Sequence, residues 1–477
     1  MPHPATMFFL LTLLVVFLSW IFDIYGLSVV NPANGMEIKA QSLLSPEGIR
    51  WSLRHVVTNF TGFAPLGMVM VTMLGVGVAE HAGFIDACIR QGLKVKMNKR
   101  FVVFLVIFLG IISNVVGDAG YIILIPIAAM LFRSVGLHPI SGIITAYVSV
   151  ACGFSANLFL STLDPLLARF TQEAAAVSGV YQGNTGALNN YYFMFVSTFL
   201  IAGIIYWVTI RFLLPSLGSY EESAFSSYKH LSRKERRALF LSLLAGAAYT
   251  LIIGLATFSP WGILRGITGG MTRSPFIVGA LFLISFGIGL MGLIYGFVSG
   301  RYRSDSDVIK GMSQPMSLLA VYFVIAFFAA QMFACFEYSR LDKCLSIAGA
   351  NLLTSVHANG FVTLLLFILF SALVNLIMVS STAKWTFMSF IFVPMFAASG
   401  IAPDWTQCAY RIGDSVTNAI TPFLFYMPLV LAYMQQYDKR ANYASLLGYT
   451  WRYSLFIFIC WTALFVVWYL LDLPLGM

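Results

Sequence analysis

Five ionisable residues interrupt long apolar stretches of a chain that carries little charge elsewhere: Asp118, Asp164, Lys384, Arg411 and Asp414. An ionisable side chain at membrane depth costs at least about 2.5 kcal/mol on insertion scales, so it faces a partner or a water-filled cavity and marks a substrate or ion path. Arg411 and Asp414 are three residues apart, which places their side chains on one face of a helix. We therefore expect the chemistry of this chain to centre on these charged groups.

The side chains near these charges suit an anionic aromatic ligand. Arg411 offers a planar guanidinium that can bind a carboxylate or a sulfonyl-like group through two parallel hydrogen bonds, and Trp385 offers a flat face to an aromatic ring. Asp164 and Asp414 can orient an amine, hold Arg411 in place or exchange a proton. The predicted substrate-binding residues are Asp164, Asn375, Ser381, Trp385, Arg411 and Asp414. The alternative is structural: an ion pair between Arg411 and Asp414, and a hydrogen bond between helices for Asn375.

Small polar residues form two matched groups at interruptions of apolar helices. Pro165 and Pro422 lie close to these groups in the chain, and each removes a backbone donor and frees an upstream carbonyl. Freed carbonyls together with Ser, Thr and Asn oxygens make an oxygen-rich cage, which suits Na⁺ as a coupling ion. The predicted Na⁺ ligands are Ser113, Asn114, Gly153 and Asn157 in the first group, and Ser380, Ser381, Thr417 and Asn418 in the second. The alternative is that these residues only join helices in the bilayer.

The composition predicts an integral membrane protein. Of 477 residues, 59% are hydrophobic and 10% are charged, whereas about a quarter of residues are charged in a soluble domain. Residues 1–477 are expected to form one membrane domain. The net charge of +9 comes from basic residues in short loops, which is typical of cytoplasmic loops rather than of a nucleic-acid-binding surface. The six histidines are scattered and no P-loop motif occurs, so no cofactor is predicted and neither a zinc enzyme nor an ATP-driven pump is indicated.

Apolar stretches of about 20 residues predict membrane-spanning helices. The predicted spans are 7–28, 59–84, 139–163, 191–214, 239–258, 276–298, 314–336, 405–433 and 453–472. Two further apolar tracts, 101–132 and 360–398, have a polar break in the middle, so each predicts a re-entrant hairpin that ends near the midplane. With these nine spans and two hairpins, every cluster of basic loop residues falls on the cytoplasmic side. The amino terminus is then cytoplasmic and the carboxyl terminus periplasmic.

The two hairpins would enter the membrane from opposite sides, as an inverted repeat requires. The first repeat comprises the hairpin 101–132 and the broken helix 139–163, and the second comprises 360–398 and 405–433. Paired interrupted segments in the two halves of a chain point to the binding site of a secondary transporter. The predicted fold is therefore an all-α membrane protein with nine transmembrane helices and two re-entrant hairpins in an inverted repeat.

At these breaks the sequence resembles the p-aminobenzoyl-glutamate transporter (AbgT) family over essentially its whole length. The stretches that carry the resemblance are 113–120 (SNVVGDAG), 153–157 (GFSAN), 164–167 (DPLL), 381–385 (STAKW) and 410–418 (YRIGDSVTN). The resemblance implies a homodimer of the bacterial inner membrane, related in architecture to divalent-anion/Na⁺ symporters. It also implies an ion-coupled substrate path with Asp164, Trp385, Arg411 and Asp414 in functional positions. Val115 replaces the Thr of the related symporters, which removes one hydroxyl from the first cage.

The resemblance and the residues together predict a secondary active transporter rather than an enzyme. The expected substrates are p-aminobenzoyl-glutamate-like compounds, with export of sulfonamide antimetabolites and hence antibiotic resistance, driven by a Na⁺ or proton gradient. The alternative substrate class is a dicarboxylate moved by Na⁺ symport, which competition by succinate would reveal. A passive channel is a further alternative, and counterflow in vesicles distinguishes it because only a carrier exchanges label against a gradient.

Overall fold

The structure is a computed structural model, and its helices follow the apolar pattern of the sequence. It describes residues 3–30, 35–93, 98–116, 120–156, 158–161, 163–178, 186–218, 231–259, 261–266, 274–344, 347–348 and 360–476. Seven helical stretches in this described part are long and apolar enough to cross a membrane. They are α1 (Pro4–Ile24), α2 with α3 (Pro46–Thr61 and Ala64–His81), α9 (Tyr191–Val208, continuing to Leu217), α11 (Arg233–Phe258), α12 (Pro275–Ser299), α14 (Ala320–Ser339) and α20 (Tyr443–Leu470). These correspond to seven of the predicted spans.

The other two predicted spans, 139–163 and 405–433, each contain a shorter helix. They hold α7 (Pro139–Cys152) and α18 (Pro403–Val416), and turns follow each helix where it ends. After the turns the chain continues into α8 (Leu163–Ser178) and α19 (Met427–Tyr437) respectively.

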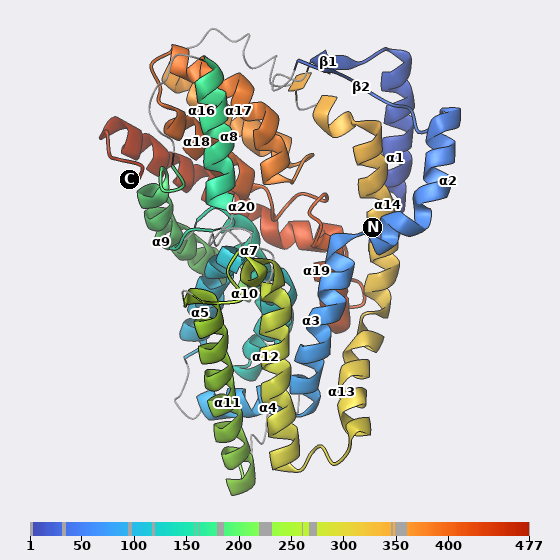
Figure 1. The fold of residues 1–477 in the computed structure, drawn as a ribbon, viewed down its shortest axis with the longest axis vertical. Coiled ribbons are helices and arrows are strands. Elements are labelled where there is room, and N and C mark those ends of the chain that lie inside the picture. The colour runs from blue at the N-terminus through green and yellow to red at the C-terminus, as the bar shows by residue number, and fades with distance from the viewer. Residues whose placement is uncertain are drawn as a thin grey trace.

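Helices α3, α11, α12 and two shorter neighbours form a separate bundle at one end of the molecule (Figure 1). The neighbours are α4 (Phe84–Leu93) and α13 (Asp305–Leu318). This bundle has its own buried cluster, in which the Tyr302 hydroxyl donates to the Val78 carbonyl at 2.8 Å. A Cβ at Gly75 or Gly292 would meet the backbone of the facing helix, so α3 and α12 approach closely through small residues, as membrane helices often do.

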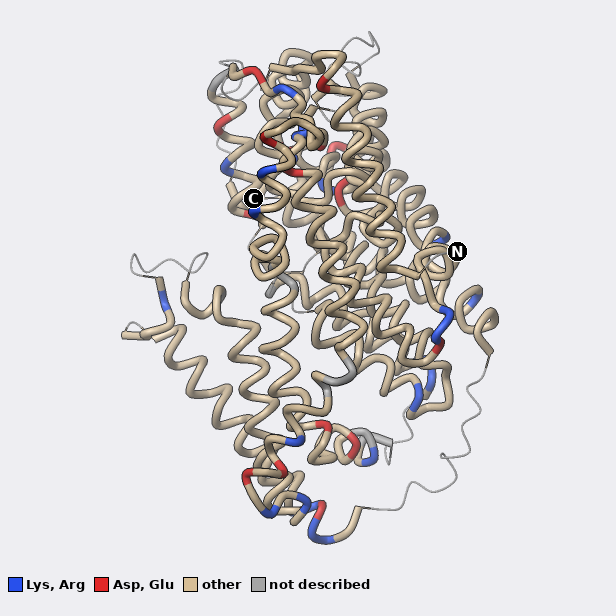
Figure 2. The backbone as a smooth tube through the Cα atoms, turned by 90° about the vertical axis from the view of Figure 1, so that its right-hand side faces the viewer, with Lys and Arg blue, Asp and Glu red and all other residues tan. Residues whose placement is uncertain are grey.

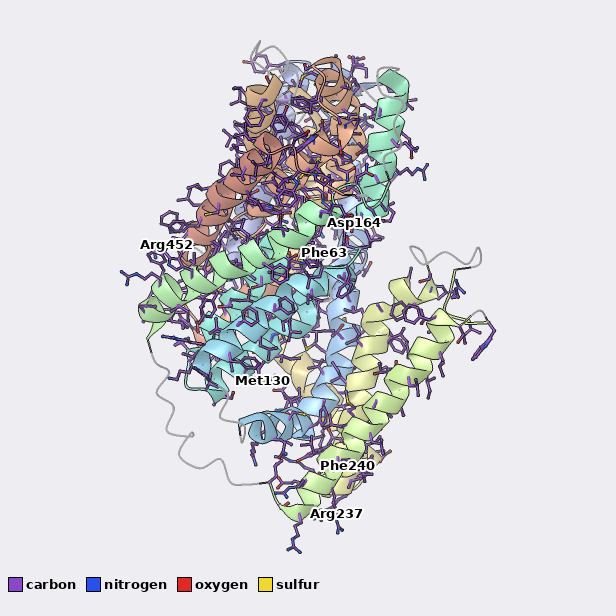
Figure 3. All side chains as sticks on the ribbon, turned by 90° about the vertical axis from the view of Figure 1, so that its left-hand side faces the viewer. Phe63, Met130, Asp164, Arg237, Phe240 and Arg452 are labelled. Atoms are coloured by element: carbon purple, nitrogen blue, oxygen red, sulfur yellow. The ribbon has the colours of Figure 1, made fainter. Side chains whose placement is uncertain are left out.

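Basic residues gather at the far end of this bundle, where Figure 2 shows Lys and Arg close together at the bottom and Figure 3 shows Arg237. Arg90 at the end of α4 and Arg301 after α12 both act electrostatically on Glu235 at the start of α11. Glu235 also accepts a hydrogen bond from the Ser232 backbone amide at 2.7 Å. Three basic segments that are distant in the sequence therefore meet on one side of the molecule, as the charge pattern predicts for cytoplasmic loops.

One element departs from the all-helical prediction. Strands β1 (Ser28–Val30) and β2 (Glu37–Lys39) pair antiparallel after α1, with Val29 opposite Ile38. Val29 is buried while the residues on either side are exposed, which is the alternation expected for a half-buried strand. The segment is too short for this alternation to stand out in the sequence.

The two tracts with polar breaks fold as pairs of helical arms. The first contains α5 (Lys99–Ser113), the short turns η1 (Asn114–Val116) and η2 (Gly120–Leu124), and α6 (Ile125–Ser134). The second contains α16 (Gly360–Asn375) and α17 (Ser381–Ala398). Phe367 of α16 contacts both Phe392 and Phe396 of α17, so the second pair of arms lies side by side. At 1.5 Å per residue, α5 and α16 are only about 22 to 24 Å long, which is shorter than the roughly 30 Å hydrocarbon core.

Candidate functional site

Helix α18 is polar in sequence yet buried along almost its whole length. Every side chain from Thr406 to Val416 is buried, including Arg411 and Asp414. A buried charge is tolerated only when a partner and hydrogen bonds compensate its lost hydration. The partners of these two residues come from different helices.

Arg411 pairs with Asp164, the second residue of α8. The Arg411 Nη2 atom lies 2.6 Å from Asp164 Oδ1 and donates to the Ser155 carbonyl at 3.3 Å. The other carboxylate oxygen of Asp164 accepts from the Ser161 amide at 2.5 Å and from the Ser161 hydroxyl at 2.9 Å. Among the described residues, Arg411 Nε has no hydrogen-bond partner. The pair therefore retains one buried donor that a ligand could satisfy, beside the inner end of α8 (Figure 3).

Asp414 pairs with Lys384 of α17 rather than with Arg411. The Lys384 ammonium lies 2.5 Å from Asp414 Oδ1, and both side chains are buried. The Tyr410 hydroxyl lies 2.6 Å from the Ser381 carbonyl and 3.2 Å from Asp414 Oδ1. Asp414 Oδ2 has no partner among the described residues. The structure thus replaces the single Arg411–Asp414 pair considered from sequence by two pairs, each with one unsatisfied polar atom.

Lys384 is the residue of this site that was missing from the predicted substrate-binding set. Its signal in the sequence is a charge within the apolar tract 360–398. A lysine near a helix start can equally extend its ammonium to the membrane interface, so the sequence did not distinguish the two roles. The structure gives it no exposure at all, and its ammonium donates to Asn375 as well as binding Asp414.

Trp385 is fully buried and joins three helices. Its ring stacks on Tyr410 with centroids 4.3 Å apart, and its Nε1 donates to Thr171 Oγ1 of α8 at 2.9 Å. Thr171 in turn donates to Gln407 of α18 at 2.6 Å. One face of the indole is therefore covered by Tyr410, and in this conformation Trp385 positions α8, α17 and α18 relative to one another.

We expect Trp385→Phe to weaken this junction without emptying it. Phenylalanine keeps an aromatic ring against Tyr410 but loses the indole N–H, so the hydrogen bond to Thr171 is lost. Loss of one neutral hydrogen bond costs about 0.5 to 1.5 kcal/mol, so we expect a roughly two- to tenfold rise in the half-saturating substrate concentration. Concentration-dependent uptake measures this change. Trp405→Phe is the control, because the Trp405 ring packs against Phe465 and Tyr469 of α20. Unchanged uptake would contradict this role.

The second predicted Na⁺ group is drawn together by one amide. Asn375 Nδ2 donates to Thr417 Oγ1 at 3.0 Å and to Asn418 Oδ1 at 2.8 Å. The Thr417 hydroxyl donates to the Ala372 carbonyl, while the Ser380 hydroxyl caps α17 by accepting from the Ala383 amide. Asn375 and Thr417 thus link α16 to the turn after α18, whereas Ser380 bonds within its own helix.

The first predicted Na⁺ group lies at the end of α5 and the end of α7. Asn114 Nδ2 donates to the Ile111 carbonyl at 3.2 Å and to the Val150 carbonyl of α7 at 3.1 Å. The Ser113 hydroxyl donates to the Gly110 carbonyl, and Gly153 follows the last residue of α7. Asn157 and Asp118 lie outside the described residues. Within the described part of the chain, no cluster of His, Cys, Asp and Glu could hold a metal ion.

Asn418 of the second group contacts α7 close to the point where that helix ends. Asn418 Nδ2 donates to the Ala151 carbonyl of α7 at 3.1 Å, and the Tyr147 hydroxyl donates to the Asn418 carbonyl at 3.3 Å. Residues 267 positions apart in the chain are thus in direct contact. The ends of α7 and α18 form one junction between the two halves of the molecule.

A cavity of about 200 Å³ lies at this junction. Tyr121 and Phe154 line it from the first half of the chain, and Ser381, Asn418 and Tyr426 line it from the second. The four paired charges lie outside its lining. Because ligand pockets commonly measure about 300 to 1,000 Å³, the cavity is too small in this conformation for a drug-sized molecule.

A second cavity, of about 300 Å³, adjoins the first at Ser380, which lines both. The lining of this aromatic cavity includes Glu337 in the last turn of α14, Asp342 and Lys343 beyond the end of that helix, and the side chains of Phe333, Phe336, Phe423 and Phe425. Aromatic rings beside a lysine suit a ligand that joins a ring to an acid. The aromatic cavity therefore offers a route toward the break between α16 and α17.

Burial raises the pKa of the Asp342 carboxyl in the aromatic cavity, and nearby Glu337 adds to the shift while Lys343 opposes it. A raised pKa in the folded state means that the folded protein holds this proton more tightly than the unfolded chain. The stability due to Asp342 is therefore lost as pH rises through its folded-state pKa. We expect Asp342→Asn to reduce the fall in melting temperature between mildly acidic and neutral pH. Equal pH profiles for the variant and the original protein would refute this expectation.

Buried paired charges at interrupted helices, within a chain that crosses a membrane several times, define a membrane transporter. The sequence matches the AbgT putative transporter family over residues 1–477. The chain therefore belongs to this family, which is a family of membrane transporters and not of enzymes. This family is the one that the sequence stretches around the helix breaks resemble.

Individual relatives cover the whole chain. The p-aminobenzoyl-glutamate transport protein of Escherichia coli strain K12 is 32% identical over 480 residues, covering 100% of this chain and 93% of that protein. The YdaH transporter of Alcanivorax borkumensis, described as having an unusual topology, is 36% identical with a TM-score of 0.55 and full coverage of both chains. Neisseria gonorrhoeae MtrF, described as illuminating a class of antimetabolite efflux pumps, is 38% identical with a TM-score of 0.53, covering 98% of this chain and 95% of its own.

Proposed function

We propose that this chain is a secondary active transporter of p-aminobenzoyl-glutamate-like compounds that also exports sulfonamide antimetabolites. The observation that carries the proposal is the pair of buried ion pairs, Arg411–Asp164 and Lys384–Asp414, each with one unsatisfied polar atom. The relative from Escherichia coli supports the first substrate class, and the neisserial relative supports the second. Both kinds of substrate join an aniline ring to an anionic or sulfonyl group.

The site can bind such a molecule by exchange of partners. A substrate carboxylate or sulfonyl oxygen would replace part of the contact between Arg411 and Asp164 and would also satisfy Arg411 Nε. An aniline nitrogen would donate to Asp414 Oδ2. Arg411 would then keep an anionic partner while the substrate is bound, so entry of the substrate avoids the cost of leaving a buried guanidinium unpaired.

Two helix starts favour an anion at the junction. Leu163 and Ser381 are the first residues of α8 and α17, and both line the 200 Å³ cavity. The amino-terminal end of a helix carries a partial positive charge. Two such ends directed at one cavity would attract the acidic part of the substrate.

The architecture we propose has two re-entrant hairpins, 101–132 and 360–398, in an inverted repeat. The short arms α5 and α16 support it, and so does a shared contact. Gly110 of α5 packs against Ser149 of α7, and Gly413 of α18 packs against Ser371 of α16. In each repeat a glycine and a serine thus bring the first arm close to the interrupted helix.

Opposed hairpins give a route for alternating access. When one hairpin separates from the junction, the site would open to one side of the membrane while the other hairpin keeps it closed. We propose this mechanism in a homodimer of the bacterial inner membrane, with the amino terminus in the cytoplasm and the carboxyl terminus in the periplasm. A Na⁺ or proton gradient would drive the cycle. None of the relatives named above is described as a dicarboxylate symporter, so that alternative has no support.

Uptake and efflux in proteoliposomes test the proposal. Labelled p-aminobenzoyl-glutamate and a labelled sulfonamide should each move when a Na⁺ or pH gradient is imposed, and unlabelled aniline compounds should compete while succinate does not. Movement of neither compound under either gradient would refute the proposed function. Competition by succinate alone would indicate a dicarboxylate carrier.

A further inference from the structure

The ammonium of Lys384 lies where the second repeat would hold a cation. It is fully buried, it lies 2.5 Å from Asp414 Oδ1, and it donates to Asn375 Oδ1. Asn375 is also the residue that contacts both Thr417 and Asn418, two of the predicted Na⁺ ligands. The Lys384 ammonium is therefore connected through Asn375 to Thr417 and Asn418, whose oxygen atoms are predicted Na⁺ ligands.

The hydrogen-bond pattern shows that these oxygens are already engaged. The Asn375 carbonyl oxygen accepts from Lys384, so the Asn375 amide nitrogen must face Thr417 Oγ1 and Asn418 Oδ1, to which it donates. A cation needs oxygen ligands, and an N–H group directed at the same oxygens occupies their lone pairs and repels the ion. The residues of the second group therefore do not fit a bound Na⁺ in this arrangement.

The charges around Lys384 explain why a lysine is stable there. Asp414 and Tyr410 face it from α18, with the Tyr410 ring centroid 5.9 Å from the ammonium. On α8, Asp164 is engaged by Arg411. Helix α16 carries no ionisable residue. Asp414 is thus the anion that compensates Lys384, and the two partners together are electrically neutral.

The first repeat lacks such a built-in cation. The tract 101–132 contains Asp118 but no lysine or arginine, whereas 360–398 contains Lys384 but no acidic residue. Asn114 of the first group bonds backbone carbonyls rather than a charged side chain. The two tracts therefore differ in the sign of their one charged residue.

We propose that Lys384 is a tethered cation that takes the place of Na⁺ in the second repeat. The inference rests on the proposed transport function, because it specifies how that function is coupled to ions. It predicts that a variant without the Lys384 ammonium becomes dependent on Na⁺. When the ammonium is removed, Asp414 and the oxygens of Asn375, Thr417 and Asn418 become available to Na⁺.

The test compares Lys384→Gln with Lys384→Arg and with the exposed control Lys310→Gln. Thermal stability of each purified protein is measured without substrate in Na⁺ and in choline, and counterflow of labelled p-aminobenzoyl-glutamate is measured over a series of Na⁺ concentrations. We expect Na⁺ to stabilise Lys384→Gln more than the original protein, and to raise its apparent substrate affinity by about 5- to 150-fold, the range usual for coupled sites. Lys384→Arg and Lys310→Gln should keep the original Na⁺ dependence.

Two results would overturn the proposal. One is an equal Na⁺ dependence of stability in Lys384→Gln and the original protein. The other is a Lys384→Gln protein that folds but in which Na⁺ does not restore counterflow. If Lys384→Gln fails to fold, the neutral double variant Lys384→Met with Asp414→Asn replaces it. That variant has no carboxylate for the ion, so it should show no added stabilisation by Na⁺, and added stabilisation would refute the assignment.

The stability measurement separates this inference from the proposed function. It uses no substrate, so it reports on the ion site even if p-aminobenzoyl-glutamate is not transported. Absence of counterflow in the original protein would refute the proposed substrate class alone. Equal Na⁺ stabilisation of all variants would refute the tethered cation alone.

Discussion

Arg411→Ala is expected to abolish transport while the protein still inserts into the membrane. The change removes the group proposed to bind the acidic end of the substrate, and it leaves Asp164 buried without its ion-pair partner 2.6 Å away. Truncating one member of a buried charge pair costs about 2 to 5 kcal/mol of binding, which is roughly 30-fold or more in affinity. The same loss lowers stability by about 3 to 5 kcal/mol. Flux in proteoliposomes and melting temperature in detergent measure the two effects.

An exposed ion pair provides the matched control for this change. Arg169 and Glu173 of α8 lie 2.7 Å apart, with side chains 69% and 43% exposed. Arg169→Ala should cost less than about 1 kcal/mol of stability and should leave the flux unchanged. Flux at the original level in Arg411→Ala would show that Arg411 is not part of the substrate site.

Asp414→Ala is expected to abolish transport for a different reason. It removes the carboxylate that compensates Lys384 and the free oxygen proposed to accept from the aniline nitrogen. Because Lys384 then stays buried without a carboxylate in the described part of the chain, with Asn375 as its hydrogen-bond partner, stability should fall by about 3 to 5 kcal/mol. Flux and melting temperature should both decrease, whereas Glu173→Ala should change neither. An active and stable Asp414→Ala protein would contradict the role of the Lys384–Asp414 pair.

The sequence was sufficient to locate the charged groups and not their pairing. An ionisable residue within an apolar stretch is visible from composition alone, and four of the five residues found in this way are buried in the described structure. Their partners are not visible, because Asp164 and Arg411 are separated by 247 positions, 411 minus 164, and meet only when α8 packs on α18. The sequence left a pair between Arg411 and Asp414 as the structural alternative, whereas the structure pairs Arg411 with Asp164, one of the two aspartates that the sequence offered to hold it.

Hydrogen-bond direction was the other property that the sequence could not supply. Thr417 and Asn418 have the oxygen atoms that a Na⁺ site requires, yet both accept from Asn375, whose orientation is set by Lys384. Trp385 was predicted as an open aromatic face, but packing of α17 on α8 places its ring against Tyr410 and Thr171. Seven spans followed directly from apolar length, because that property is local to each helix.

Counterflow of labelled p-aminobenzoyl-glutamate tests the central claim most directly, because a carrier must turn one buried site alternately toward each side of the membrane. Proteoliposomes loaded with unlabelled compound should transiently accumulate label above its outside concentration, and Arg411→Ala vesicles should not. Label that only equilibrates in both preparations would show that the chain does not carry this substrate through the paired charges of α8, α17 and α18.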